Sequence, residues 1–237
     1  VAKNTQTVYD TVTFFFDNAG PTSRITQPKD SNFYNFLDTI KGTANDATSG
    51  VAYDGIRLQI IDLTQGATYW NGANWVDTSQ WVVASGSYTW TYDMNNWLSG
   101  HQYEIICKAS DNSSPTVWES TSTANHIKFV YDVVSPTSAI TSVNSEDKLK
   151  SLNTIKGTCL DDWQVDEITL EIKNTDDNYT WTGSSWSSNS HVVYATVFTS
   201  SWTYDSIGVS WKSGKNYTLT PKAYDFVPNS QDTLYPV

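Results

Sequence analysis

Apolar and polar residues alternate with a period of two in several short segments of the chain. Ile56, Leu58 and Ile60 share one face of such a segment, and residues 103–107 and 168–172 repeat the arrangement. Side chains point alternately to the two faces of a strand, so this pattern predicts strands with one buried face. No segment shows sustained apolar spacing of 3.6 residues, the period typical of helices. The hydrophobic pattern therefore predicts an all-β protein.

Six sequence blocks occur twice and in the same order. TIKGTA at 39–44 returns as TIKGTC at 154–159, an offset of 115 residues. The other pairs, at offsets between 111 and 115, are PTSRIT and PTSAIT, YWNGANW and TWTGSSW, SYTWTYD and SSWTYD, WLSGHQY and WKSGKNY, and KASD and KAYD. Repetition at a fixed period indicates duplicated structural units, each here of a size typical for one domain.

We predict three parts: an N-terminal strand at 1–17, a first domain at 18–131 and a second domain at 132–237. The segment 8–17, VYDTVTFFFD, resembles KFVYD at 128–132, the end of the first copy. The N-terminal segment therefore resembles the last strand of a preceding repeat. An isolated strand has unpaired edges, so we expect it either to fold onto the first domain or to pair with a neighbouring molecule.

The net charge of the chain limits the classes of molecule that it is expected to bind. The 237 residues carry a net charge of -11, which argues against binding to nucleic acid or to anionic lipid. No stretch of about 18 apolar residues is present, so we expect no membrane insertion. The chain begins at Val1 with no basic and apolar leader, and we expect a mature chain or a fragment.

About seven short strands per copy are typical of an immunoglobulin-like β-sandwich, so we predict two such domains in tandem. A tyrosine after a turn, at the start of the sixth strand of such sandwiches, forms a corner by bonding back to the backbone. Tyr103 and Tyr217 in the SGxxY blocks are our candidates for this residue. The pair Asn71-Gly72 predicts a tight hairpin turn between Trp70 and Trp75.

The repeated blocks carry a family resemblance. P-T-S-x-I-T, T-I-K-G-T, W-x-G-x-x-W, W-T-Y-D, S-G-x-x-Y and K-A-x-D together resemble bacterial Ig-like repeats, from Asp17 to nearly the end of the chain. Such repeats occur in tandem in large secreted or surface-attached proteins. The resemblance implies a non-catalytic structural or adhesive module at the cell surface, with neighbouring repeats or another protein as partners.

Several aspartates fall where loops and linkers should meet. In such a sandwich the second and sixth strands run toward the N-terminal end of the domain, so the acids that follow them should lie near the incoming linker. The candidate ligands are Asp17, Asp46 and Asp111 in the first copy, and Asp132, Asp161, Asp162 and Asp225 in the second. Clustered carboxylates suit Ca²⁺, which would stiffen each junction. The alternative is that these residues are ordinary turn aspartates.

Aromatic residues offer a second class of function. Eight tryptophans recur at matched places, which favours a packing role: Trp70, Trp75, Trp90, Trp97, Trp181, Trp186, Trp202 and Trp211. Trp118 and Trp163 are unmatched and lie in loop-like segments, so they are candidates to face a ligand. Exposed tryptophan rings can stack on sugars. A carbohydrate-binding accessory module of a secreted glycan-active enzyme is therefore the alternative function.

Catalytic chemistry has little support in the sequence. His101, His126 and His191 lie near no nucleophile or metal-ligand motif. Cys107 and Cys159 fall in different copies, and each is expected to be a small buried hydrophobic residue. We therefore predict that the chain is not an enzyme and needs no catalytic cofactor.

Overall fold

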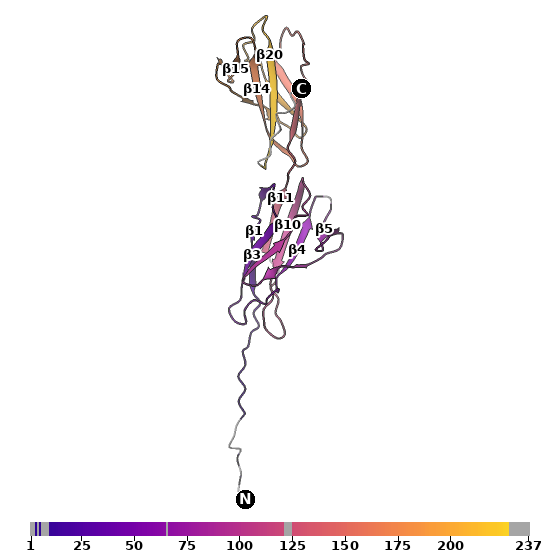
Figure 1. Ribbon diagram of the computed structural model, residues 1–237, viewed down its shortest axis with the longest axis vertical. Coiled ribbons are helices and arrows are strands. Elements are labelled where there is room, and N and C mark those ends of the chain that lie inside the picture. The colour runs from indigo at the N-terminus through magenta and orange to yellow at the C-terminus, as the bar shows by residue number, and fades with distance from the viewer. Residues whose placement is uncertain (1–2, 4, 6–9, 65, 121–124, 228–237) are drawn as a thin grey trace.

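A computed structural model describes residues 3, 5, 10–64, 66–120 and 125–227. The described residues form strands, turns and loops, and the prediction of an all-β fold is confirmed. Two β-sandwiches follow one another along the long axis of the molecule (Figure 1). The described part of the chain contains no helix that could cross a membrane.

The first sandwich consists of two sheets. Its strands are β1 (Thr22–Gln27), β2 (Asn32–Tyr34), β3 (Thr39–Asn45), β4 (Arg57–Asp62), β5 (Thr68–Trp70), β6 (Trp75–Val76), β7 (Val82–Val83), β8 (Ser85–Gly86), β9 (Thr89–Asp93), β10 (His101–Lys108) and β11 (His126–Tyr131). One sheet has the order β1-β3-β9-β8, and the other has the order β2-β11-β10-β4-β5-β6, with β7 also paired to β4.

The second sandwich repeats this plan. Its strands are β12 (Thr137–Ile140), β13 (Thr154–Leu160), β14 (Val165–Asn174), β15 (Tyr179–Trp181), β16 (Trp186–Ser187), β17 (Val193–Tyr194), β18 (Thr196–Val197), β19 (Ser201–Asp205) and β20 (Tyr217–Asp225). One sheet has the order β12-β13-β19-β18, and the other has the order β16-β15-β14-β17, with β20 also paired to β14. β13, β14, β19 and β20 thus repeat β3, β4, β9 and β10.

Each sandwich has its own hydrophobic core, and the repeated TIKGT block explains how the core closes. The glycine of each block, Gly42 or Gly157, lies under a fully buried tryptophan, Trp90 or Trp202. A Cβ atom on either glycine would overlap the indole ring and a backbone carbonyl of the neighbouring strand. The block therefore recurs because only glycine lets the tryptophan lie flat against the strand.

Both predicted tyrosine corners are present. The hydroxyl of Tyr103 accepts a hydrogen bond from the backbone amide of Leu98, and that of Tyr217 accepts one from Lys212, each at 2.7 Å. In both cases the bond reaches five residues back along the chain, as expected for this motif. The two corners fix the loops that precede β10 and β20.

The predicted hairpin between Trp70 and Trp75 is present, but its predicted tight turn at Asn71-Gly72 is wrong. The rings of Trp70 and Trp75 contact each other with centroids 5.5 Å apart. The connection is a four-residue loop from Asn71 to Asn74 rather than a two-residue turn, since the amides of Ala73 and Asn74 both donate to the side-chain oxygen of Asn71. A side-chain oxygen that caps the loop replaces the tight backbone turn.

The remaining scaffold residues lie as expected. Cys107 and Cys159 are buried free thiols. Five of the matched tryptophans are buried and the other three are half-buried against the cores. The proposed boundaries 1–17, 18–131 and 132–237 stay predictions. Of the N-terminal segment, residues 10–16 lead away from the first sandwich and 10–17 form no strand, while most of 1–9 lies outside the described residues (Figure 1).

Candidate metal centre

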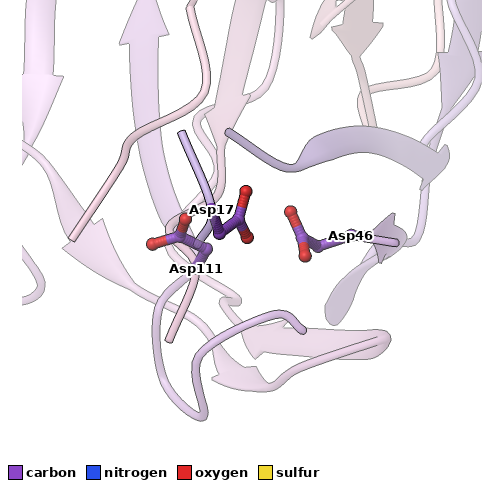
Figure 2. Close-up of side chains that lie close together, drawn as sticks. All are labelled: Asp17, Asp46 and Asp111. Carbon is purple, nitrogen blue, oxygen red and sulfur yellow. The ribbon is translucent and has the colours of Figure 1, made fainter. Parts of the chain in front are cut away.

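The first acidic cluster joins the linker to two loops of the first sandwich. Asp17 lies in the linker, Asp46 directly follows β3, and Asp111 lies in the loop after β10. One carboxylate oxygen from each of the three lies within 4.8 Å of the other two. Figure 2 shows the three carboxyl groups gathered around one space. Three residues separated by 29 and 65 positions therefore come together as the direction of the strands predicted.

Hydrogen bonds hold these carboxylates in place. The amide of Ser49 donates to Asp17 at 3.0 Å, and the amide of Gly50 donates to Asp46 at 2.8 Å. Hydrogen bonds from Ser49 and Ala19 keep the pKa of Asp17 below its ordinary value. These hydrogen bonds favour the charged form of Asp17 and fix the loop at Ser49 and Gly50 against the two carboxylates.

Asp111 is the buried member of this cluster. It accepts hydrogen bonds from the hydroxyl of Ser113 at 2.7 Å and from the amide of Val117 at 2.8 Å. Burial alone would raise the pKa of Asp111, but the bonds from Ser113 and Val117 outweigh it, so the pKa lies below its ordinary value. In the described chain, Asp17, Asp46 and Asp111 form no ion pair with Lys, Arg or His.

The second cluster occupies the equivalent place between the two sandwiches. Asp132 follows β11, and Asp161 and Asp162 follow β13. One carboxylate oxygen from each again lies within 4.8 Å of the others. Asp132 and Asp161 correspond to Asp17 and Asp46 at the repeat offset of 115. The linker aspartate and the aspartate after the second long strand thus recur in both groups, while the third member differs.

The pKa values of Asp132 and Asp161 in the second cluster are raised, whereas those of Asp17 and Asp111 in the first cluster are lowered. Burial, together with the charges of Asp161 and Asp162, raises the pKa of Asp132 to about 7. Burial also raises the pKa of Asp161, whose Oδ1 atom is enclosed and has no hydrogen-bond donor within the described chain. Asp132 is buried, Asp161 is half-buried and Asp162 is exposed, and a cation placed between carboxylates that repel one another would stabilise their charged forms.

Asp225, the last predicted ligand, is not in the second group. It is buried at the end of β20, where it lies opposite Val165 on β14. Asp162, which aligns with Ala47 of the first copy, takes the third place in the cluster instead. The prediction brought together six of the seven aspartates, as two groups of three.

Two residues near the second cluster were missed. The hydroxyl of Ser99 donates to Asp132 at 3.2 Å and accepts from the amide of Val133 at 2.9 Å. Gly100, at φ +71°, approaches Asp162 so closely that a Cβ atom would overlap its backbone carbonyl. One sequence feature could have indicated Ser99 and Gly100. The Ser-Gly pair recurs in WLSGHQY and WKSGKNY, and a repeated Ser-Gly turn has a structural cause.

The chemistry of both groups fits a hard divalent cation. Ca²⁺ takes six to eight oxygen ligands, and carboxylates supply either one or two each. Three aspartates per group provide three to six oxygens, and backbone carbonyls and water supply the remainder in sites of this kind. None of the six is a sulfur or imidazole ligand, so the donor set favours Ca²⁺ over zinc or copper.

Neither of the two candidate sugar-binding tryptophans presents an open ring face. Trp118 is 41% exposed, but the ammonium of Lys108 and the guanidinium of Arg57 lie 5.1 and 5.5 Å from its ring centroid. Lys108 also lies 4.3 Å from the ring of Trp81. These cation–π contacts attach the loop around Trp118 to β10. Trp163 is half-buried beside Asp162.

Several solved structures are similar to this chain. The fibronectin(III)-like modules of Clostridium thermocellum CbhA match with a TM-score of 0.33 and 12% sequence identity, and the match covers 89% of this chain and 90% of that chain. No protein-family model matches the sequence. No curated protein matches it either.

Proposed function

We propose that this chain is a non-catalytic structural module, built of tandem Ig-like repeats, in which Ca²⁺ stiffens the entrance to each sandwich. The observation that carries the proposal is that a group of three carboxylates forms at the entrance of each sandwich, with two of its three positions equivalent in the two copies. Carboxylate oxygens that lie within 4.8 Å of one another repel when charged, and a cation between them would offset this repulsion in both groups.

The position of each cluster explains what the ion would do. Each group combines one aspartate from the linker with aspartates from loops of the sandwich that follows. An ion held by all three would connect the linker to the sandwich and fix the direction in which the chain enters. Without the ion, repulsion between the carboxylates would favour separation of linker and loops. A stalk or spacer needs this stiffness to keep its length.

The junction between the sandwiches already contains packing contacts that such an ion would reinforce. The rings of Phe33 and Phe226 stack across it, with centroids 5.3 Å apart and planes 16° from parallel. Gly100 lies against Asp162 at the same junction. One aromatic stack and one turn form a small contact, and small interfaces between domains allow relative motion. Metal binding is therefore expected to have a measurable effect on the shape of the chain.

Small-angle X-ray scattering tests this function. In excess calcium, the account predicts a longer maximum dimension and a narrower distribution of shapes than in chelator. The variant Asp161→Asn should behave in calcium as the wild-type chain does in chelator, because the second cluster loses a charged ligand. Identical scattering curves in calcium and in chelator would contradict the stiffening role.

Location at the cell surface or in the secreted fraction belongs to the same proposal. The net charge of -11 and the resemblance to bacterial Ig-like repeats support it. Extracellular calcium is abundant enough to fill sites of modest affinity. Adhesion to another protein and spacing of other domains both agree with such a module.

Carbohydrate binding is the second candidate, and the exposed ring of Trp118 is the observation in its favour. The cations beside that ring count against a free stacking face. A glycan array separates the two functions. Binding that disappears in Trp118→Ala and persists in chelator would support the accessory module over the stalk.

A further inference from the structure

Two cations and two indole rings gather on the outer face of the larger sheet of the first sandwich. The ammonium of Lys108 on β10 lies 4.3 Å from the ring centroid of Trp81 and 5.1 Å from that of Trp118. The guanidinium of Arg57, opposite Lys108 on β4, lies 5.5 Å from the Trp118 ring. We call these four residues the cationic face. Two paired strands and two loops thus bring two positive charges together over aromatic rings.

No carboxylate neutralises these charges. Within the described part of the chain, neither Arg57 nor Lys108 forms an ion pair. Arg57 donates to the backbone carbonyls of Asp54 and Ile56, at 2.7 and 3.2 Å, and neutral carbonyls leave its charge uncompensated. An indole ring attracts a cation but does not cancel its charge. The cationic face is therefore a positive area on a chain whose net charge is -11, and it attracts anions.

The sandwich itself does not require this face. The second copy has Thr169 where the first has Arg57, since each pairs with the lysine of the next long strand. It has Val192 where the first has Trp81, at the repeat offset of 111. The second sandwich forms with these smaller, uncharged residues. The arginine and the tryptophan of the cationic face consequently have a cause other than the fold.

Hydrogen bonds hold the loop of Trp118 in place. The carboxylate of the next residue, Glu119, accepts from the backbone amides of Ser23 and Ala109, at 2.7 and 3.0 Å. It also accepts from the side-chain amide of Asn125 at 2.8 Å. These bonds attach the loop to both sheets. The cationic face is thus formed before a ligand arrives, which lowers the entropy that binding costs.

We propose that the cationic face docks an acidic polypeptide segment of a partner protein, whose carboxylates pair with Arg57 and Lys108. Apolar side chains of that segment would contact Trp118, which is 41% exposed, and Val83, which lies opposite Arg57 and is 48% exposed. Tryptophan and arginine are enriched at the centres of protein–protein interfaces. The cations beside the Trp118 ring favour a ligand held by charge over a sugar stacked on the ring.

The docking surface gives a partner to the adhesive role within the proposed function, and it rests on that role but not on calcium. The hydrogen bonds to Glu119 involve no metal ligand. Peptide binding is therefore expected to be equal in calcium and in chelator. Lost peptide binding with an intact calcium effect on shape would contradict the docking alone. The opposite pair of results would contradict the stiffening alone.

Fluorescence anisotropy of a labelled short peptide of glutamate and leucine, titrated with the full chain, tests the docking. We expect saturable binding that weakens as salt is added, and little binding of the same peptide with glutamine in place of glutamate. Arg57→Thr introduces the residue of the second copy and should weaken binding about tenfold. Arg24→Ala is the matched control. It removes the same charge from β1 in the other sheet, introduces the equivalent residue Ala139, and should bind as the wild type does.

Two further measurements locate the contact. Trp81→Val, again the residue of the second copy, should weaken binding because Lys108 loses its nearer ring. Carbodiimide, which joins a lysine amine to a carboxylate as an amide, should link the peptide to Lys108 in preference to Lys41 on the other sheet. Circular dichroism checks that each variant folds.

Three results would overturn the proposal: no binding of the glutamate peptide, equal binding of the glutamine peptide, or an equal loss in Arg24→Ala. Polygalacturonate provides the remaining comparison, because it presents carboxylates on a sugar chain. If it binds with a loss in Arg57→Thr while the peptide does not bind, the surface belongs to an acidic glycan and the polypeptide partner is excluded.

Discussion

Gly42 and Gly157 show how a single residue type closes each core. Each lies beneath a buried tryptophan, where an added methyl group overlaps an indole ring and a backbone carbonyl. We predict that Gly42→Ala or Gly157→Ala lowers the free energy of unfolding by about 1–3 kcal/mol, the usual cost of overpacking. Urea denaturation measures the change. Gly208→Ala is the control, since no atom lies within 4 Å of the position of its added carbon.

A loss of stability in Gly208→Ala as large as in Gly42→Ala would show that the backbone preference of glycine, and not the indole contact, sets the cost. Equal stability of Gly42→Ala and the wild type would show that Trp90 can move aside.

Asp132 gives the second prediction at this scale. Its pKa in the folded protein is about 7, above the ordinary value of 3.8, so the folded state binds this proton more tightly than the unfolded state does. In chelator, its contribution therefore favours folding at low pH and is lost as pH rises through 7. Asp132→Asn should be more stable than the wild type at pH 8, by on the order of 1–3 kcal/mol, with a smaller difference at pH 5.

Melting temperatures of both proteins across this pH range, measured in chelator, provide the test. Asp17→Asn is a useful contrast, because the pKa of Asp17 is lowered and its contribution to stability is lost only under acid conditions. Parallel curves for Asp132→Asn and the wild type would mean that the carboxyl is not buried as described.

At the scale of elements, the turn before β10 joins the two sandwiches. Gly100 and Gly214 occupy equivalent turns with φ values of +71° and +75°, but only Gly100 contacts the other sandwich, at Asp162. Alanine at either position should cost about 1 kcal/mol through its positive φ. Gly100→Ala alone should also weaken calcium binding at the second cluster and broaden the shape distribution in scattering at low protein concentration.

The same effect of Gly214→Ala on the second cluster would contradict this assignment, since that turn lies at the far end of the second sandwich. Unchanged calcium binding in Gly100→Ala would show that the turn only touches Asp162 and does not position it.

Sequence patterns predicted the elements well where the cause is local. Alternation located β4, β10 and β14, and the SGxxY blocks located both tyrosine corners. The Asn71-Gly72 pair was less informative, because backbone preference alone does not reveal that the side chain of Asn71 accepts two amide hydrogens and opens the loop to four residues. Thr182 in the second copy does the same with its hydroxyl, which accepts from the amide of Ser185 at 3.1 Å.

The candidate site was predictable to the extent that strand direction determines it. Asp46 and Asp111 follow strands that run toward the same end, so their meeting with Asp17 required only the sandwich topology. The place of Asp162, and not Asp225, in the second group depends on the details of one loop, and the contact of Gly100 depends on how the two sandwiches meet. No local sequence pattern predicts either feature.

At the scale of the whole molecule, the two carboxylate groups lie at successive domain entrances along one chain. Each group lies where the chain enters a sandwich through an aspartate, at Asp17 and again at Asp132. Calcium bound at both places would stiffen the two successive entrances along the chain.

Isothermal titration of the chelator-treated chain with calcium tests the central claim most directly. The account predicts saturable binding at two sites per chain and a rise in melting temperature. One site should disappear in the double variant Asp17→Asn/Asp46→Asn and the other in Asp132→Asn/Asp161→Asn. No heat of binding together with an unchanged melting temperature in calcium would contradict it, and would leave the two groups as aspartates that only bend their loops.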